Sequence, residues 1–257
     1  MTAPDSSVIA TRALMLKVGA RVLVEQLDWS AGTGEFWCLL GPNGVGKTTL
    51  LRALAGVPPL DAVLLHGQAL PTWEPRALAR VRGLMPQQTH DAFSASVLET
   101  AMIGRHPHLD AWVWESGEDV TSTRASLARV GMAQLATRDV TTLSGGERQR
   151  VALAQLLTQD PAIMLLDEPS SHQDLRQQIA VFDLLRELGR GGKTLVAAVH
   201  DINLAARYGT HALLLDGAGG AIAGSVDTVL TTAHLTRIFG HPVRKIEDAD
   251  GSAFVPA

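Results

Sequence analysis

Residues 41–48 have the sequence GPNGVGKT, which fits the phosphate-binding pattern G-x-x-x-x-G-K-[ST]. Glycines at these spacings let the backbone curl so that several N–H groups point at phosphate oxygens, and a helix that starts here adds a favourable field for anions. Lys47 can reach the β- and γ-phosphates of ATP, and the Thr48 hydroxyl can ligate Mg²⁺. The loop residues predicted to bind ATP are Gly41, Pro42, Asn43, Gly44, Val45, Gly46, Lys47, Thr48 and Thr49.

Two acids follow a buried apolar run at residues 162–166. Asp167, at the carboxyl end of the expected strand, can hold Mg²⁺ directly or through water. Glu168 lies beside it and can polarise an attacking water as a general base. Alone, these acids would also fit a solvated turn before Pro169. Together with the phosphate-binding loop, they predict hydrolysis of the bound nucleotide.

The third motif is LSGGERQR at residues 143–150. Ser144 and Glu147 fit a capping box that starts a helix. That explanation does not account for the two glycines, Gly145 and Gly146. They leave the helix N-terminus bare, so that an anion can approach its N–H groups.

A framework of alternating strands and helices must position these motifs. Short apolar runs bounded by turn residues are typical of strands buried on both faces of a parallel sheet. Such runs occur at residues 36–40, 162–166, 194–199 and 212–215. Helical patterns cover residues 47–55 and 175–188. The alternation predicts an α/β fold with the core sheet of a P-loop nucleotide-binding protein.

The middle of the chain lacks this alternation and is predicted to be helical. We expect residues 89–159 to form a helical subdomain that carries the third motif. It is inserted into a nucleotide-binding α/β core of residues 1–88 and 160–230, and residues 231–257 form a small C-terminal appendage. The acids of the insert are interpreted as a solvated face and not as a metal site. These acids are Glu115, Glu118 and Asp119.

Composition limits the kind of protein. The chain has 257 residues, 46% of them hydrophobic, which is enough for a sizeable core. Asp and Glu total 26 against 22 Lys and Arg, without the basic excess that nucleic-acid binding usually shows. The single cysteine, Cys38, is interpreted as a buried small hydrophobe and fits a reducing compartment. No apolar run approaches the ~18 residues that cross a bilayer, and no signal peptide is recognised, so a cytosolic protein is expected.

The sequence LSGGERQR is similar to the signature of ABC-transporter ATPases, and the likeness extends from about residue 14 to residue 238. The resemblance implies an ABC cassette fold. It also implies that two copies stack head to tail and sandwich two ATP molecules between the phosphate loop of one and the signature of the other. Ser144, Gly145 and Gly146 would then contact the γ-phosphate held by Lys47 of the second copy.

Three further residues take roles from the same resemblance. Gln87 matches the glutamine that senses Mg²⁺ and the attacking water. His200 matches the histidine that contacts the γ-phosphate. A lone histidine is more often structural, but the position of His200 at the carboxyl end of the expected strand favours the role at the phosphate. Asp174 matches the aspartate that couples the two sites across the dimer. The predicted catalytic residues are therefore Glu168, His200 and Gln87, and the predicted Mg²⁺ ligands are Thr48, Gln87 and Asp167.

The sequence departs from the family pattern at two positions. Gln173 stands where the family usually has leucine, which bears on coupling between the sites. Val18 stands where the family usually has an aromatic that stacks on adenine. The alternatives at that position are that Trp29 or Phe36 supplies the stack, or that Val18 points into the core.

Residues 102–108 (MIGRHPH) look like a stretch of metal-chelate importers, which take up ferric siderophores, haem or cobalamin. This resemblance implies integral membrane permease subunits as partners and, indirectly, a periplasmic solute-binding protein. The cassette would lie at the cytoplasmic face of the inner membrane, held there by the permease, with residues 89–105 facing it.

Three alternatives differ in class. A cassette of an exporter with separate membrane subunits would share every catalytic residue. A cassette acting on DNA or ribosomes would carry a long coiled coil between Lys47 and Ser144, or a second cassette, and neither is present in the sequence. A nonenzymatic binding subunit should have lost Lys47 or Glu168, and both are present.

Overall fold

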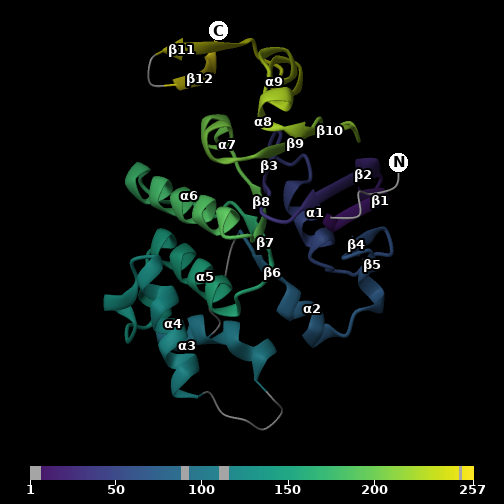
Figure 1. Ribbon diagram of the computed structural model, residues 1–257. Coiled ribbons are helices and arrows are strands. Elements are labelled where there is room, and N and C mark those ends of the chain that lie inside the picture. The colour runs from purple at the N-terminus through teal and green to yellow at the C-terminus, as the bar shows by residue number, and fades with distance from the viewer. Residues whose placement is uncertain (1–6, 88–92, 110–115, 249–250) are drawn as a thin grey trace.

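The computed structural model describes residues 7–87, 93–109, 116–248 and 251–257. At its centre lies a six-stranded sheet in the order β10-β9-β3-β8-β7-β6, in which all neighbours are parallel except β10 and β9 (Figure 1). The four predicted strands are confirmed as β3, β7, β8 and β9. The strands of the sheet are β3 (Phe36–Leu40), β6 (Arg82–Met85), β7 (Ile163–Asp167), β8 (Thr194–Ala198), β9 (His211–Leu215) and β10 (Ala221–Ser225).

Side chains of the central strands alternate between two hydrophobic cores, one on each face of the sheet. In β3, Phe36, Cys38 and Leu40 join one core, while Trp37 and Leu39 join the other. This two-sided burial explains why the strands are continuous apolar runs. Cys38 is fully buried, and burial raises the pKa of its thiol to about 12, as expected for a small hydrophobe.

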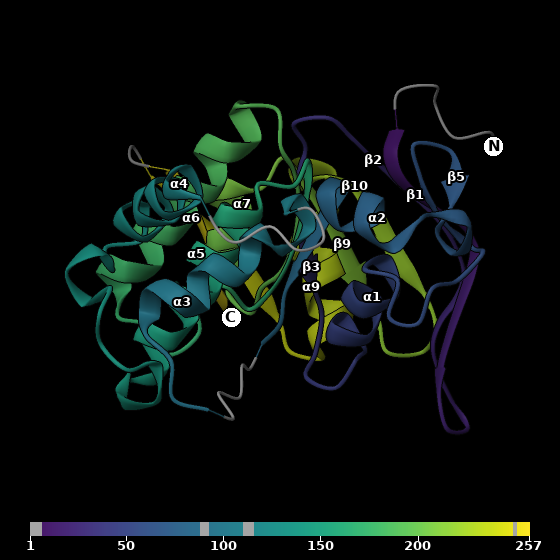
Figure 2. The same ribbon diagram turned by 90° about the horizontal axis from the view of Figure 1, so that it is seen from below.

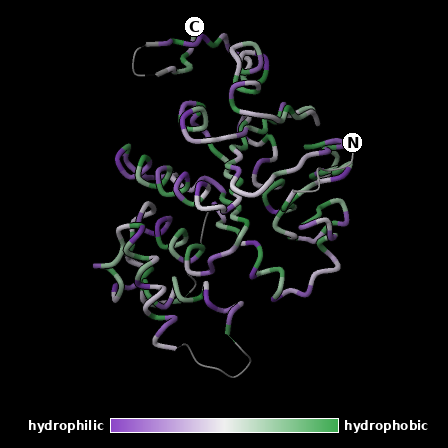
Figure 3. Tube along the Cα trace, in the orientation of Figure 1, coloured by the Kyte–Doolittle hydropathy of each residue, from purple (hydrophilic) through white to green (hydrophobic). Residues whose placement is uncertain are grey.

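Helices cover both faces of this sheet. Helix α1 (Lys47–Leu54) packs on one face, and α6 (Leu175–Arg190) and α7 (Ile202–Tyr208) pack on the other (Figure 1). Along α6, hydrophilic and hydrophobic residues alternate, whereas the central strands are mostly hydrophobic (Figure 3). The helix therefore turns one stripe to the sheet and leaves the other toward solvent.

A second, antiparallel sheet in the order β2-β1-β4-β5 packs on the α1 side. Figure 2 shows it at the edge of the molecule opposite the helical insert. The sheet leads through short elements into helix α2 and strand β6. Its strands and the following helices are β1 (Ser7–Val18), β2 (Arg21–Gly32), β4 (Val63–Leu65), β5 (Gln68–Ala69), η1 (Leu70–Thr72) and α2 (Pro75–Val81).

Between β6 and β7, the described residues form helices, which confirms the predicted insert of the ABC cassette fold. These helices are α3 (Val97–Met102), η2 (Ile103–His108), α4 (Gly117–Arg129), η3 (Ala133–Leu135), η4 (Val140–Thr142) and α5 (Gly145–Gln159). Of the predicted acidic face, Glu115 lies outside the described residues and Glu118 is exposed. For Asp119 the prediction is wrong: it is buried, caps α4 with Ser116 and pairs with Arg105 at 2.7 Å.

Residues 102–108, the stretch that resembles metal-chelate importers, pack against the other helices of the insert. A Cβ on Gly104 would lie 2.2 Å from the Gln155 carbonyl oxygen, so glycine is required for the close approach of η2 to α5. The His108 ring hydrogen-bonds the Gln159 carbonyl at 2.8 Å, and Arg105 binds Asp119 on α4. These contacts fix η2 to the other helices of the insert.

The chain ends in two short helices and a β-hairpin. The Asn203 side chain on α7 bonds the backbone of Phe254 twice, donating at 3.1 Å and accepting at 2.7 Å. The hairpin is thereby attached to the core, with the Phe254 side chain buried. These last elements are α8 (Val226–Val229), α9 (Thr232–Phe239), β11 (Val243–Asp248) and β12 (Gly251–Pro256).

Candidate nucleotide site

The loop between β3 and α1 requires glycine at three positions. Gly41, Gly44 and Gly46 have φ values of 145°, 72° and 112°, a range that side chains disfavour. A Cβ on Gly41 would also lie 2.6 Å from the Leu215 carbonyl oxygen. Gly46 is the N-cap of α1 and has no side chain to bond the first N–H groups of the helix. These groups remain available to an anion.

Lys47, the first residue of α1, is folded back over this loop. Its ammonium group donates to the carbonyl oxygens of Gly41 at 2.8 Å and Pro42 at 3.2 Å. Burial lowers the pKa of Lys47, while the nearby carboxylates of Glu168 and Asp167 act in the opposite direction. A partly desolvated cation held by its own loop is ready to exchange carbonyl oxygens for phosphate oxygens.

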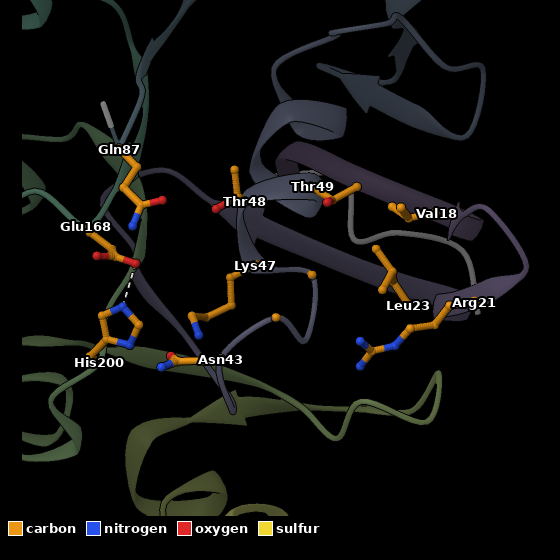
Figure 4. A pocket seen from close by; sticks show the side chains of 12 residues that line it. Val18, Arg21, Leu23, Asn43, Lys47, Thr48, Thr49, Gln87, Glu168 and His200 are labelled. Carbon is orange, nitrogen blue, oxygen red and sulfur yellow. Dashed lines mark hydrogen bonds and ion pairs between the residues drawn. The ribbon is translucent and has the colours of Figure 1, made fainter. Parts of the chain in front are cut away.

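A cleft of about 440 Å³ opens over the loop (Figure 4). Gln87, Glu168 and His200 lie at one end and Val18, Leu23 and Arg21 at the other, with Lys47 between them. The cleft therefore has a polar end suited to phosphates and a second end suited to a base. The structure thus brings together, from the predicted set, Asn43, Gly44, Gly46, Lys47, Thr48, Thr49, Gln87, Glu168 and His200.

Asp167 lies in an adjoining cavity lined also by Thr48 and Gln87. Its Oδ1 atom is buried and has no hydrogen-bond partner within the described residues. Burial raises the pKa of Asp167, and a hydrogen bond from the Thr48 hydroxyl acts against that rise. An orphaned carboxylate oxygen beside a hydroxyl is a donor set that fits Mg²⁺.

Removing the charge of Asp167 should stabilise the nucleotide-free protein. A carboxyl whose pKa is raised on folding destabilises the fold where it is ionised, and this cost vanishes as the pH falls below its unfolded pKa. We expect Asp167→Asn to raise the Tm at neutral pH, by a margin that shrinks as the pH falls. Thermal unfolding between about pH 4 and pH 8 measures it, with the exposed Asp61→Asn as control. A lower Tm at neutral pH would show that the hydrogen bond from Thr48 and the attraction of the Lys47 charge outweigh burial.

Glu168 occupies an unusual backbone conformation directly after β7. Its φ is 53°, its amide donates to the Ala198 carbonyl at 3.2 Å, and its side chain meets the His200 ring at 2.5 Å. Non-glycine residues in this region are strained and gather at functional sites. The turn points the Glu168 carboxylate into the cleft beside Lys47 (Figure 4).

Three residues of this site were not predicted from the sequence. Arg21 and Leu23, in the strand that follows Val18, line the second end of the cleft. Gln149, buried in α5, donates to the Glu168 carbonyl at 2.9 Å and so ties the signature helix to the catalytic turn. Only Gln149 had a sequence signal, because it lies inside LSGGERQR.

The signature residues lie outside the cleft of their own chain. Ser144 and Glu147 form the predicted capping box, with the Ser144 hydroxyl accepting from the Glu147 amide at 3.3 Å. A Cβ on Gly146 would lie 2.8 Å from the His172 carbonyl oxygen, so the glycine lets α5 approach the loop before Asp174. Asp174 caps α6 by accepting from the Gln177 amide at 2.9 Å. Gly41, Pro42, Val45, Gly145 and Asp174 likewise do not line the cleft.

Gln173, the departure from the family's leucine, is buried to 9% exposure. Its Oε1 atom has no partner within the described residues, and its amide nitrogen makes only a 3.5 Å contact with the Pro169 carbonyl. Its side chain packs near Gly146. An amide with an unsatisfied oxygen thus lies between the signature and the Asp174 loop.

Val18 faces the cleft and is 59% exposed, so it does not point into the core. Trp29 and Phe36 are both buried, at 6% and 2% exposure, and neither lines the cleft. The alternative that one of them stacks on the base is therefore wrong for this structure.

Val18→Tyr should tighten ATP binding by up to about fivefold, roughly 1 kcal/mol, because a ring supplies the π-face that valine lacks. With valine, ATP and GTP should bind with similar affinity, because the phosphate contacts do not depend on the base. Titration of both proteins with both nucleotides measures this. Met15→Tyr is the control, since Met15 is exposed on the same strand outside the cleft. Unchanged ATP affinity in a stable Val18→Tyr protein would show that this position does not face the base.

The fold and the cleft define a P-loop nucleotide-binding ATPase. The family model described as ABC transporter matches residues 24–171. The hemin import ATP-binding protein HmuV of Nocardia farcinica is 38% identical over 255 residues, covering 96% of this chain and 88% of its own length. The achromobactin transport ATP-binding protein CbrD of Dickeya dadantii is 35% identical, covering 93% and 90%.

Among solved structures, an inward-facing metal-chelate type ABC transporter matches with a TM-score of 0.84 and 27% identity, covering 98% of both chains. The chain belongs to the ABC transporter family, as a nucleotide-binding ATPase cassette. The resemblance inferred from LSGGERQR is thereby confirmed. Among the helices of the described residues, none combines the length and the hydrophobicity that a membrane span requires.

Proposed function

We propose that this chain hydrolyses ATP to drive an importer of a metal chelate, such as a ferric siderophore, haem or cobalamin. The observation that carries the ATPase part is the cleft in which Lys47, Glu168 and His200 meet over the glycine loop. The import part is supported by relatives that cover nearly the whole chain and bear the names of hemin and achromobactin transport proteins.

In the proposed site, the backbone N–H groups of Gly44 and Gly46 and the Lys47 ammonium hold the triphosphate. Thr48 and Asp167 hold Mg²⁺, with Gln87 close to both. When bound, Mg²⁺ neutralises phosphate charge as it develops. The Thr48 hydroxyl, which hydrogen-bonds Asp167, and the orphaned Asp167 oxygen are the observations that favour these ligands.

Glu168 acts as the general base on the attacking water, and Gln87 orients that water. His200 holds the Glu168 carboxylate at 2.5 Å before nucleotide arrives and then contacts the γ-phosphate. Most of the rate enhancement comes from position and charge, as in other phosphoryl transfers.

The active species is a head-to-tail pair of copies. The N-terminus of α5, with Ser144, Gly145 and Gly146, lies outside its own chain's cleft and is free to cover the γ-phosphate of a second copy. Asp174 then lies between the two sites and couples them. The division into a core (residues 1–88 and 160–230), an insert (89–159) and an appendage (231–257) belongs to this proposal, since the insert presents the signature.

Permease subunits hold the cassette at the cytoplasmic face of the inner membrane, and a periplasmic solute-binding protein delivers the cargo. The test is to purify the chain with its permease, place the complex in lipid vesicles and supply ATP-Mg²⁺ on the cassette side. We expect hemin or a ferric siderophore, presented with its binding protein, to be carried toward the cassette side. Cargo moving away from that side would support an exporter instead, and absence of ATP hydrolysis would overturn the proposal.

A further inference from the structure

A second cavity, of about 500 Å³, lies between helices α4, α5 and α6. Figure 1 shows these three helices packed side by side, with α6 above α5 and α4. The cavity shares no lining residue with the nucleotide cleft. Its volume is within the range of about 300–1,000 Å³ that is typical of small-molecule sites.

Three arginines from three helices line this cavity. Arg129 is the last residue of α4, Arg150 belongs to α5, and Arg176 lies in the first turn of α6. Among the lining residues the only acid is Asp174, and its carboxylate already accepts a hydrogen bond from the Gln177 amide. Arginine guanidinium groups match the planar geometry of carboxylate and phosphate oxygens.

Arg150 in particular lacks a complete set of partners. Its Nε atom is buried and makes no hydrogen bond to any described residue. An oxyanion in the cavity would instead meet the terminal nitrogens of Arg150, one of which lies 3.6 Å from where a Cβ on Gly131, another lining residue, would be. Arg129 differs, because it is paired with Glu187 at 2.9 Å.

Another part of the cavity wall is apolar. Val130, Val181 and Leu184 are all buried to below 10% exposure and face the same space. A cavity with a cationic side and an apolar side suits a ligand that carries both a charged and an apolar part.

We propose that this cavity binds a small organic anion, with a carboxylate or phosphate group on an apolar body. Such a ligand would tie α4 and α5 of the insert to α6 of the core. Because α5 begins at the signature and α6 begins at Asp174, it would also regulate hydrolysis; this second part rests on the proposed function. Binding itself does not, and it can be measured without turnover.

The probes are phenyl phosphate, benzoate, inorganic phosphate and benzyl alcohol. Each is titrated into protein saturated with ADP-Mg²⁺, so that the nucleotide cleft is already filled. We expect phenyl phosphate or benzoate to bind, inorganic phosphate to bind more weakly and benzyl alcohol not to bind. At about a hundredfold excess over Kd, the Tm should rise by about 5–10 °C. The stronger of the two aromatic anions identifies the preferred charged group.

Arg150→Gln should weaken anion binding by about tenfold or more. Because the Arg150 side chain is partly buried, Arg176→Gln provides a second variant at an exposed position, with a loss in the same direction. Arg190→Gln, at the other end of α6 and outside the cavity, is the matched control and should bind as wild type. The site is overturned if no anion binds, or if binding is the same in both cavity variants as in wild type.

Regulation is tested by ATP hydrolysis with and without the bound anion. A change in rate that disappears in Arg176→Gln supports it. An unchanged rate under saturating anion would overturn the regulatory part, and a chain that binds the anion but never hydrolyses ATP would instead count against the proposed function.

Discussion

Glu168→Gln is expected to bind ATP-Mg²⁺ and to hydrolyse it at least about a hundredfold more slowly than wild type. Glu168 is the residue whose strained turn points a carboxylate into the cleft beside Lys47. Glutamine keeps an oxygen that can accept from His200 but cannot take a proton from water. A loss of hydrolysis would therefore reflect the missing basicity of the Glu168 carboxylate and not a missing contact with His200. Phosphate release under saturating ATP measures the effect.

The same variant should trap a nucleotide-bound dimer. Without hydrolysis, the γ-phosphates continue to bridge the two copies, so size-exclusion chromatography with ATP-Mg²⁺ should show a dimer that wild type forms only transiently. Glu118→Gln is the control, because Glu118 is exposed on α4 and lies outside the cleft. Turnover near the wild-type rate in Glu168→Gln would remove this residue from the role of general base.

The parts of the fold that the sequence predicts are those with a local signal. Strands β3, β7, β8 and β9 were predictable because both of their faces are buried, which makes each a continuous apolar run. The antiparallel sheet was not among the predicted elements. Strand β1 contains register shifts against β2 and a positive φ of 44° at Ala13, which break the alternation that would reveal it.

In the candidate site, too, residues of a contiguous motif were predictable, whereas contacts between distant parts of the chain were not. The glycine loop and Lys47 are contiguous in sequence, so their geometry follows from a single motif. The bond from Gln149 to the Glu168 carbonyl joins α5 to the end of β7, and only the folded chain reveals it. Asp119 was wrongly predicted to be solvated because its partner Arg105 lies 14 residues away, in η2.

Mixing two inactive variants should restore activity. Ser144→Arg blocks the signature and Lys47→Ala removes the phosphate-binding cation, so each variant alone should have both composite sites impaired. In a head-to-tail heterodimer, the Lys47 of the first chain faces the unaltered signature of the second, which leaves one site intact. The other site carries both changes. At equal concentrations half of the dimers are mixed, so activity should reach about a quarter of the wild-type value if the sites act independently.

The recovery of activity on mixing is expected because Ser144 and Lys47 lie apart within a single chain. Ser144 caps α5 outside the cleft that contains Lys47, so a site that needs both must draw them from two copies. Ser144→Ala mixed with Lys47→Ala is the matched control, since alanine removes the cap without filling the space that a second copy's phosphate would occupy. ATP hydrolysis is measured across mixing ratios and should peak near equal amounts of Ser144→Arg and Lys47→Ala. Activity that merely averages the two variants at every ratio would show that each cleft works within its own chain.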